Sequence, residues 1–434
     1  MRVAYLAAGA GGMYCGNCLR DNLLAATLLE QGRDVVLLPL YTPIRTDERD
    51  VSEHRVLYGG ISVYLQHVSR IFKHTPRFVD RMLDAPGLLR WVMRTAGDTK
   101  SERLLGTLTV SMLEGADGRH AKELQKLIDV LQAVKPDVIN LPNLMFVGLA
   151  RRLKDAIGAP VVCTLAGEDG FLLGLAEPYR AQALKLIAER GKDVDGFIAM
   201  TDYYARYAAN AFNLRADRID VVPIGVRPSA ELAEPPENEV FTIGYFTRIC
   251  REKGLHLLVD AVAELRRTGR SCRLRVGGYL GRSHRPYLDE VRRRARTGGL
   301  EGAFEYIGET DRAGKIALLR SVDVFCVPSV LPDAKGRPVI EALGEGVPVV
   351  EPNAGAYPEL VDATGGGILY DPNDPRGLTD ALSRIMDDGD LRRRLGAEGR
   401  RAVLERYTSE IMADRCWSIY ERIHAGAAAP RQRR

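Results

Sequence analysis

Short apolar strands alternate with helical patterns in both halves of this 434-residue chain, and this alternation restricts the fold more than any other feature. In the first half, the apolar run Val3–Ala8 precedes a glycine turn, and leucines then recur at helical spacing as far as Leu28. In the second half, the strand-like run Phe241–Phe246 precedes a basic loop and the helical pattern Leu255–Leu265. Such alternation predicts parallel sheets covered by helices.

The two halves are separated by Arg227–Glu239, a segment rich in proline and acidic residues. A chain of this length usually forms more than one core. We therefore predict an N-terminal domain over 1–230, with a helix-rich insertion at about 54–131, and a C-terminal domain over 231–405. A C-terminal helix is expected over 406–424, and a disordered tail over 425–434.

The segment Pro328–Glu359 concentrates residues that suit a nucleotide sugar. Asp333 and Glu341 have seven residues between them, and Pro338 favours a helix start in that interval. A helix N-terminus offers N–H groups and partial positive charge to a phosphate, whereas ionised carboxylates accept hydrogen bonds from sugar hydroxyls. Taken without its context, an acid pair at this spacing is more often a pair of solvated surface charges.

This segment resembles the retaining family 4 glycosyltransferases, which carry PS-x-x-E-G-F-G-x-x-x-x-E-A-x-x-x-G-x-P-V-V and then a GG-x-x-E turn. Asp333 stands where the first Glu is usual, Glu341 matches the second, and Ala334-Lys335-Gly336 replaces Gly-Phe-Gly. Upstream, Gly244–Gly254 is similar to the family's G-R-L-x-x-x-K-G segment, although Thr247 replaces a glycine. The resemblance implies the GT-B fold, with two doubly wound Rossmann-like domains facing across a cleft and a C-terminal helix that returns to the first domain.

The resemblance also implies a role for each matching residue. Arg248 and Lys253 are expected to grip the donor diphosphate, because fixed cations offset the negative charge of a departing diphosphate without a metal. Asp333 is assigned to sugar-ring hydroxyls, and Glu341 to ribose hydroxyls. Further expected donor contacts are the N–H groups around Lys335, Gly336 and Arg337, the backbone at Thr310, and the glycine loop with Gly11 and Gly12; Asp169 is a candidate contact for sugar or acceptor.

These assignments imply a retaining hexosyltransferase that takes a nucleoside-diphosphate sugar, with UDP as the first expectation for the nucleotide. The segments matched to the donor site carry no Asp-x-Asp metal motif, so metal independence is expected, and no cofactor is expected either. Two alternatives stay open: a non-catalytic nucleotide-sugar-binding or regulatory protein on the same fold, and another enzyme on that fold, such as an epimerase or a phosphorylase.

Three further features have competing interpretations. Cys15 and Cys18 form a CxxC, which suits a redox pair or half of a zinc site, but small residues packed in a turn explain it as well. Ala166 occupies the place of the family's usual donor-contacting His in Thr164–Asp169. The basic, amphipathic stretch Arg77–Arg94 suits either a membrane surface near a lipid acceptor or packing on its own domain.

Composition and charge give no indication of a nucleic-acid-binding, membrane-spanning or secreted protein. A net charge of +4 gives no indication of nucleic-acid binding, and no apolar run reaches the about 18 residues of a membrane span. The N-terminus lacks the long apolar segment of a secretory signal, and seven irregularly spaced cysteines suggest reduced thiols. We therefore expect a cytoplasmic protein whose partners are a nucleotide-sugar donor and a small-molecule or lipid acceptor, with peripheral membrane contact at most.

Overall fold

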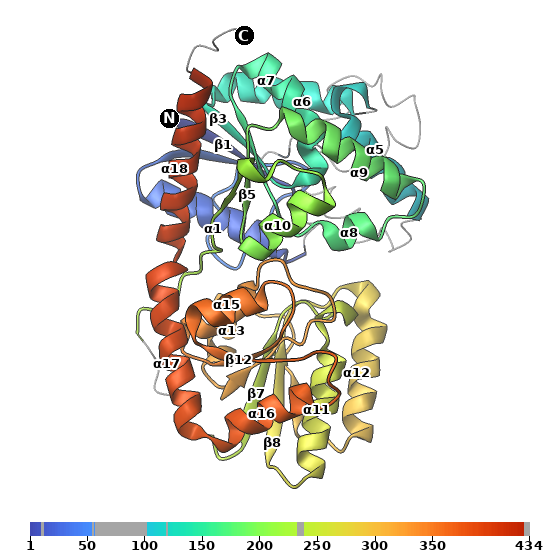
Figure 1. Ribbon diagram of the computed structural model, residues 1–434, viewed down its shortest axis with the longest axis vertical. Helices are drawn as coiled ribbons and strands as arrows, with labels where there is room; N and C mark the ends of the chain where they lie inside the picture. Colours follow the sequence, from blue (N-terminus) through green and yellow to red (C-terminus); the bar gives the residue numbers. More distant parts are fainter. Residues whose placement is uncertain (10–12, 54–55, 57–101, 119, 232–237, 429–434) are drawn as a thin grey trace. The chain divides into compact units, whose positions relative to one another are not determined.

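The computed structural model describes residues 1–9, 13–53, 56, 102–118, 120–231 and 238–428 (Figure 1). The chain divides into two compact units. Unit 1 contains Met1–Pro223 and Met412–Arg434, and unit 2 contains Ile224–Ile411. The domains predicted from the sequence end at residues 230 and 405, a few residues away from these boundaries. Each unit has its own parallel sheet and its own helices.

Unit 1 contains a six-stranded parallel sheet in the order β2-β1-β3-β4-β5-β6. Its strands are β1 (Arg2–Ala7), β2 (Asp34–Pro39), β3 (Val138–Leu141), β4 (Val161–Thr164), β5 (Gly196–Ala199) and β6 (Ile219–Val221). The described helices are α1 (Gly16–Glu30), α5 (Glu102–Glu114), α6 (Ala121–Val134), α7 (Ala150–Ile157), α8 (Asp169–Leu173), α9 (Tyr179–Arg190), α10 (Asp202–Ala211) and α18 (Ser409–Ala428). Short 3₁₀ turns are η2 (Gly115–Asp117), η3 (Leu144–Leu149), η4 (Gly191–Asp193) and η5 (Ala216–Arg218).

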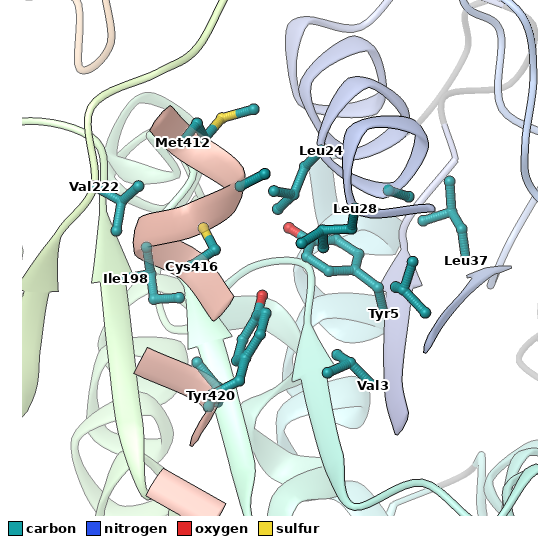
Figure 2. Packing of buried hydrophobic residues seen from close by; sticks show 14 of the residues in the cluster. Val3, Tyr5, Leu24, Leu28, Leu37, Ile198, Val222, Met412, Cys416 and Tyr420 are labelled. Atoms are coloured by element: carbon teal, nitrogen blue, oxygen red, sulfur yellow. The ribbon is translucent and has the colours of Figure 1, made fainter. Parts of the chain in front are cut away.

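The last helix, α18, contributes to the hydrophobic core of unit 1. Met412, Cys416 and Tyr420 are buried in one cluster with Leu24 of α1 and Tyr5 of β1, as Figure 2 shows. Burial of such side chains stabilises a fold by roughly 1.5–3 kcal/mol each relative to exposure. Helix α18 is therefore an integral part of the core around the first strand.

Unit 2 contains the second parallel sheet, in the order β12-β11-β10-β7-β8-β9. Its strands are β7 (Phe241–Phe246), β8 (Cys272–Gly277), β9 (Phe304–Tyr306), β10 (Val324–Phe325), β11 (Val349–Pro352) and β12 (Gly367–Tyr370). Its helices are α11 (Leu255–Arg267), α12 (Arg285–Thr297), α13 (Arg312–Leu319), α14 (Arg337–Gly344), α15 (Tyr357–Thr364), α16 (Gly377–Asp387) and α17 (Gly389–Arg406), with 3₁₀ turns η6 (Arg251–Lys253) and η7 (Arg282–His284). The predicted parallel α/β organisation is thus confirmed in both units.

The C-terminal helix expected over 406–424 corresponds to α18 (Ser409–Ala428), which is separate from α17, since α17 ends at Arg406. Between them, Thr408 forms a parallel bridge with Val226, so its backbone is extended there. Residues 425–428, expected to be disordered, continue α18, since three of the four are alanine, which has the highest helix propensity. Among the described helices, none is long and apolar enough to cross a membrane.

Candidate functional site

The candidate site lies at the carboxyl ends of β7 and β10, where the strand order of the unit 2 sheet reverses. Open parallel sheets bind ligands at such a switch point. The loops that follow the two strands are in direct backbone contact, because Val330 donates its N–H to the carbonyl of Glu252 at 2.9 Å. Gly254 has a φ of +68°, and a Cβ atom there would lie 1.8 Å from the carbonyl oxygen of Pro328. This approach therefore requires glycine.

Lys253 and Asp333 meet at this switch point in an ion pair between the Lys253 ammonium and Asp333 Oδ2. The other carboxylate oxygen, Oδ1, accepts the N–H groups of Lys335 at 2.8 Å and Gly336 at 2.9 Å. Burial raises the pKa of Asp333, but the charge of Lys253 and these hydrogen bonds outweigh it and hold the pKa well below the usual range. Asp333 is therefore a firmly ionised carboxylate surrounded by donors.

The turn after β11 packs against the backbone of Asp333. Ala356 donates its N–H to the carbonyl of Asp333 at 2.8 Å. Gly355 has a φ of +64°, and a Cβ atom there would lie 2.7 Å from both the N and the O of Asp333. The Asn353–Gly355 turn therefore places its backbone against Asp333, where a side chain at residue 355 would not fit.

Glu341 projects from α14, which has Pro338 in its first turn as predicted. Its Oε1 accepts hydrogen bonds from Lys315 Nζ at 2.8 Å and Arg337 Nε at 2.9 Å. Burial raises the pKa of Glu341, but the two cations outweigh it and lower the pKa to about 2. Oε2 accepts no hydrogen bond from the residues that the structure describes, so one oxygen of an ionised carboxylate remains open to a ligand hydroxyl.

Lys315 was missed by the sequence analysis. It lies on α13, is buried, and lines a small pocket with Arg312, Arg337 and Glu341. Nothing in the pattern around it distinguishes it from an ordinary helical lysine, because its partner is 26 residues away in sequence. Only the packing of α13 beside α14 reveals the pair.

The other predicted donor contacts in unit 2 differ in exposure. Arg248 is exposed in the loop after β7, and its guanidinium makes no hydrogen bond or ion pair with any residue that the structure describes. Thr310 is partly exposed between the edge strand β9 and α13. The N–H groups of Lys335 and Gly336, predicted to bind phosphate, donate to Asp333, so a phosphate must displace that carboxylate to reach them.

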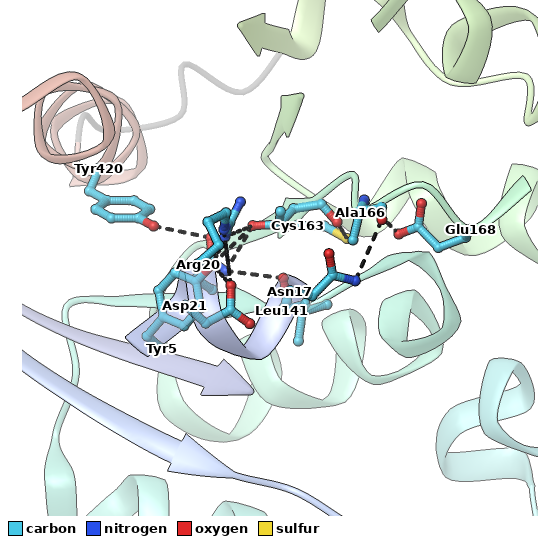
Figure 3. A network of polar contacts seen from close by, with 11 residues as sticks. Tyr5, Asn17, Arg20, Asp21, Leu141, Cys163, Ala166, Glu168 and Tyr420 are labelled. Carbon is cyan, nitrogen blue, oxygen red and sulfur yellow. Dashed lines mark hydrogen bonds and ion pairs between the residues drawn. The ribbon is translucent and has the colours of Figure 1, made fainter. Parts of the chain in front are cut away.

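The predicted contacts in the first half of the chain belong to unit 1. Asp169 is the first residue of α8 and is partly exposed. Its neighbour Glu168, which the sequence analysis passed over, is buried and joins two loops at the carboxyl edge of the sheet (Figure 3). Glu168 Oε1 accepts the N–H groups of Leu144 and Ala166, each at 3.0 Å, and Oε2 accepts the hydroxyl of Tyr204 at 3.0 Å. Gly11 and Gly12 lie outside the described residues, as does Arg77–Arg94.

The CxxC motif lies at the start of α1. Cys15 precedes the helix and Cys18 is buried in its first turn, and neither forms a disulfide bond. A hydrogen bond with Cys15, together with burial, raises the pKa of Cys18, which disfavours a reactive thiolate. Across the described ranges, no group of three or more His, Cys, Asp or Glu side chains is arranged to hold a metal ion.

Two protein families match adjoining parts of the chain. The family described as Glycosyltransferase Family 4 matches residues 102–230, and the family described as Glycosyl transferases group 1 matches residues 230–402. The second match includes every predicted donor contact in unit 2. The match therefore extends over most of both halves of the chain.

Curated relatives include a phosphatidyl-myo-inositol mannosyltransferase of Mycobacterium leprae, 29% identical over 235 residues, which are 52% of this chain and 59% of the relative. An MMP alpha-(1->4)-mannosyltransferase of Mycolicibacterium hassiacum is 32% identical over 221 residues, 50% of this chain and 52% of the relative. The chain thus spans between about half and three-fifths of the length of these relatives.

Solved structures similar in fold include Anabaena HepE in complex with UDP, with a TM-score of 0.69, 16% identity, and coverage of 97% of this chain and 100% of that one. Sucrose-phosphate synthase from Thermosynechococcus elongatus also has a TM-score of 0.69, with 17% identity and coverage of 98% and 100%. The similar structures establish the fold, and the matching family models establish the family to which the chain belongs. The chain belongs to the family 4 glycosyltransferases and has the GT-B fold.

Proposed function

We propose that this protein is a retaining hexosyltransferase that moves a hexose from a nucleoside-diphosphate sugar to a hydroxyl of a small-molecule or lipid acceptor. The observation that carries the proposal is the set of donors around the Asp333 carboxylate: the Lys253 ammonium and the N–H groups of Lys335 and Gly336. These donors already hold one carboxylate at the sheet's switch point, so the site suits an anion, and the exposed Arg248 lies on the same loop as Lys253.

The chemistry of each residue follows from its surroundings. Arg248 and Lys253 take the diphosphate and offset the negative charge that develops when the bond from the sugar C1 to the phosphate oxygen breaks. Glu341 accepts a ribose hydroxyl at its open Oε2. Asp333, ionised at any physiological pH, accepts a sugar hydroxyl after it gives up part of its contact with Lys253.

The proposed mechanism retains the anomeric configuration at C1 and needs no protein side chain as a general base for the acceptor hydroxyl. The acceptor oxygen forms its bond to C1 on the face that the diphosphate leaves. The acceptor's proton passes to the leaving phosphate oxygen, so no protein group has to change its protonation state. Because the fixed cations replace a metal, turnover is expected to continue in EDTA.

The mannosyltransferase names of the relatives support a hexose, and mannose is the first sugar to test. UDP remains our prediction for the nucleotide, supported by its presence in the HepE structure. The relative named as a phosphatidyl-myo-inositol mannosyltransferase makes an inositol-bearing lipid a reasonable acceptor to test first.

A thermal-shift screen with UDP, GDP and ADP tests the donor site directly. A nucleotide at a hundred times its dissociation constant stabilises a protein by about 2.7 kcal/mol, so the melting temperature rises measurably. Arg270→Ala serves as a control, because Arg270 lies before β8, at the opposite edge of the sheet. If no nucleotide raises the melting temperature at millimolar concentration, the donor site is refuted.

A second candidate is a binding or regulatory protein without turnover. It is favoured by the engagement of Asp333 with three donors, which leaves it less open to a sugar. Incubation with UDP- and GDP-hexoses and an acceptor panel separates the two: product formation excludes the binding protein, whereas nucleotide binding with no transfer or donor hydrolysis supports it.

A further inference from the structure

Glu351 is a buried carboxyl group that the proposed reaction does not use. It lies in β11, beside Leu369 of β12, and its side chain is fully buried. Its Oε1 accepts the N–H of Val327 at 3.1 Å, whereas its Oε2 has no hydrogen-bond partner among the described residues. A carboxylate with a single hydrogen bond in an apolar interior is costly, so such a group either takes a proton or needs a cation.

The groups that face Glu351 come from five surrounding segments. They are Lys253 after β7, Cys326 and the Val327 N–H after β10, Asp333 before α14, Tyr357 of α15 and Tyr370 of β12. Lys253 is the one cation in this described set, and it is already paired with Asp333. Burial and the nearby Asp333 charge therefore raise the pKa of Glu351 well above its usual range, and Lys253 opposes this only in part.

The protonation state of Glu351 decides the net charge beneath the candidate donor site. Arg248 and Lys253 carry two positive charges, and Asp333 carries one negative charge. With Glu351 neutral the four groups sum to one positive charge, and with Glu351 ionised they sum to zero. An anionic diphosphate is attracted in the first case, and in the second it meets an additional buried negative charge.

We propose that Glu351 is a positioning residue of the donor site, whose neutral carboxyl group leaves Lys253 available to a nucleoside diphosphate. It acts through Lys253 and contacts no substrate, since its side chain is fully buried. The inference rests on the proposed function, because it concerns the same diphosphate site. It adds an acid on β11 whose ionisation opposes donor binding.

Glu351→Gln is the informative variant, because an amide keeps the shape and the acceptor for Val327 but cannot ionise. Nucleotide affinity for UDP, GDP and ADP is measured by calorimetry from neutral to alkaline pH. We expect the wild type to lose about tenfold more affinity than the variant over this range, since one added like charge opposes binding. Near neutral pH both proteins are expected to bind equally, and Glu305→Gln, on the exposed edge strand β9, is expected to follow the wild type.

The melting temperature without nucleotide gives a second readout. A carboxyl group with a raised folded-state pKa contributes stability that is present below its unfolded pKa, near 4.5, and lost as the pH rises through the folded value. Glu351→Gln is therefore expected to melt above the wild type by a margin that widens as the pH rises from about 4.5. Glu351→Ala also cannot ionise, and it replaces Glu351→Gln in every comparison if the amide variant does not fold.

Parallel pH profiles of nucleotide affinity in wild type and variant would overturn the inference while leaving the donor site intact. Absence of nucleotide binding in every protein would instead overturn the proposed function and this inference with it. A flattened profile in Glu351→Gln supports both. A merely structural role would lower the melting temperature of the variant without changing the pH dependence of binding.

Discussion

Each unit contains a largely buried pair of an aspartate and a cationic side chain. The pKa of the aspartate is shifted in opposite directions in the two pairs. Arg20 and Asp21 of α1 are almost completely buried, with side-chain exposures of 4% and 3%. Lys253 and Asp333 are less enclosed, at 16% and 11%. Burial raises the pKa of Asp21 to about 6 despite Arg20, whereas the pKa of Asp333 ends well below its usual range.

The difference lies in the donors that each carboxylate receives. Asp21 Oδ1 accepts the Tyr5 hydroxyl at 3.0 Å and Arg20 Nε at 3.1 Å, and no residue that the structure describes donates a backbone N–H to it. Asp333 accepts two backbone N–H groups and an ammonium. The charge of Lys253 lowers the pKa of Asp333 most, and the backbone donors of Gly336 and Lys335 add to it, whereas at Asp21 burial outweighs the single guanidinium.

The two pairs also serve different parts of the molecule. Around Tyr5, Arg20 and Asp21, a buried polar network reaches Thr164 of β4 and Asn140 of β3, and Asn140 accepts the hydroxyl of Tyr420 from α18 at 3.2 Å (Figure 3). This network anchors the last helix to the first strand. The Lys253–Asp333 pair instead lies at the carboxyl ends of the central strands β7 and β10, where we propose that the donor binds. The comparison thus sets a pair within the core of unit 1 against a pair in the proposed donor site.

The largest expected effect comes from breaking the buried pair of unit 1. Arg20→Met removes the cation but keeps a long side chain, and breaking a buried pair typically costs about 3–5 kcal/mol of unfolding free energy. Urea unfolding measures the loss. The double variant Arg20→Met with Asp21→Leu removes both charges and is expected to recover much of the stability. A single variant as stable as the wild type would contradict a structural role for this pair.

The titration of Asp21 gives the next effect in size. Its folded-state pKa of about 6 lies above the unfolded value of 3.8, so the stability that Asp21 contributes is present below pH 3.8 and lost as the pH rises to 6. The difference in unfolding free energy between wild type and Asp21→Asn is expected to fall by about 3 kcal/mol over this range. Urea unfolding at several pH values measures it. A flat difference would show that Asp21 stays ionised in the fold.

Much of unit 2 could be predicted from the sequence, because its strands and helix starts are marked by residues close together in the chain. Strand β7 was expected at Phe241–Phe246, where it is observed, and Pro338 marked the start of α14. The residues that sequence reasoning missed form their hydrogen bonds and ion pairs with partners far away in the sequence. Lys315 meets Glu341 across two helices, and the Asp21 network depends on α18, whose Tyr420 is 280 residues from Asn140. Periodicity shows that a residue faces inward but does not show which polar group it will meet there.

Removing the cations of the proposed donor site tests the role of the Lys253–Asp333 pair in unit 2. Arg248→Ala and Lys253→Ala are each expected to lower the turnover rate by roughly a hundredfold or more, because each removes a preorganised charge from the leaving group. Their stabilities should differ, since Arg248 is exposed whereas Lys253 neutralises Asp333. Steady-state kinetics and thermal melting measure the two effects, with Arg270→Ala as the matched surface control. Wild-type turnover in either variant would remove that residue from the mechanism.

The smallest expected effect concerns the length of the acid at position 333. The carboxylate of Asp333 receives N–H groups two and three residues ahead, a geometry that suits a short side chain. Asp333→Glu restores the residue that is usual in the family but moves the carboxylate outward by one methylene. We expect a stability loss of about 1 kcal/mol, comparable to the loss of a helix-capping side chain, and a modest fall in turnover with nucleotide binding retained.

Asp333→Asn separates charge from geometry at the same position. The amide oxygen still accepts both N–H groups, but its charge no longer balances Lys253. Because the folded-state pKa of Asp333 is lowered, its stability contribution is present above pH 3.8 and lost as the pH falls through the folded value. The difference in melting temperature between wild type and Asp333→Asn should therefore be largest near neutral pH and shrink in acid, opposite to the trend for Asp21. Trends of the same sign at both positions would show that Lys253 and the backbone donors do not keep Asp333 ionised in the fold.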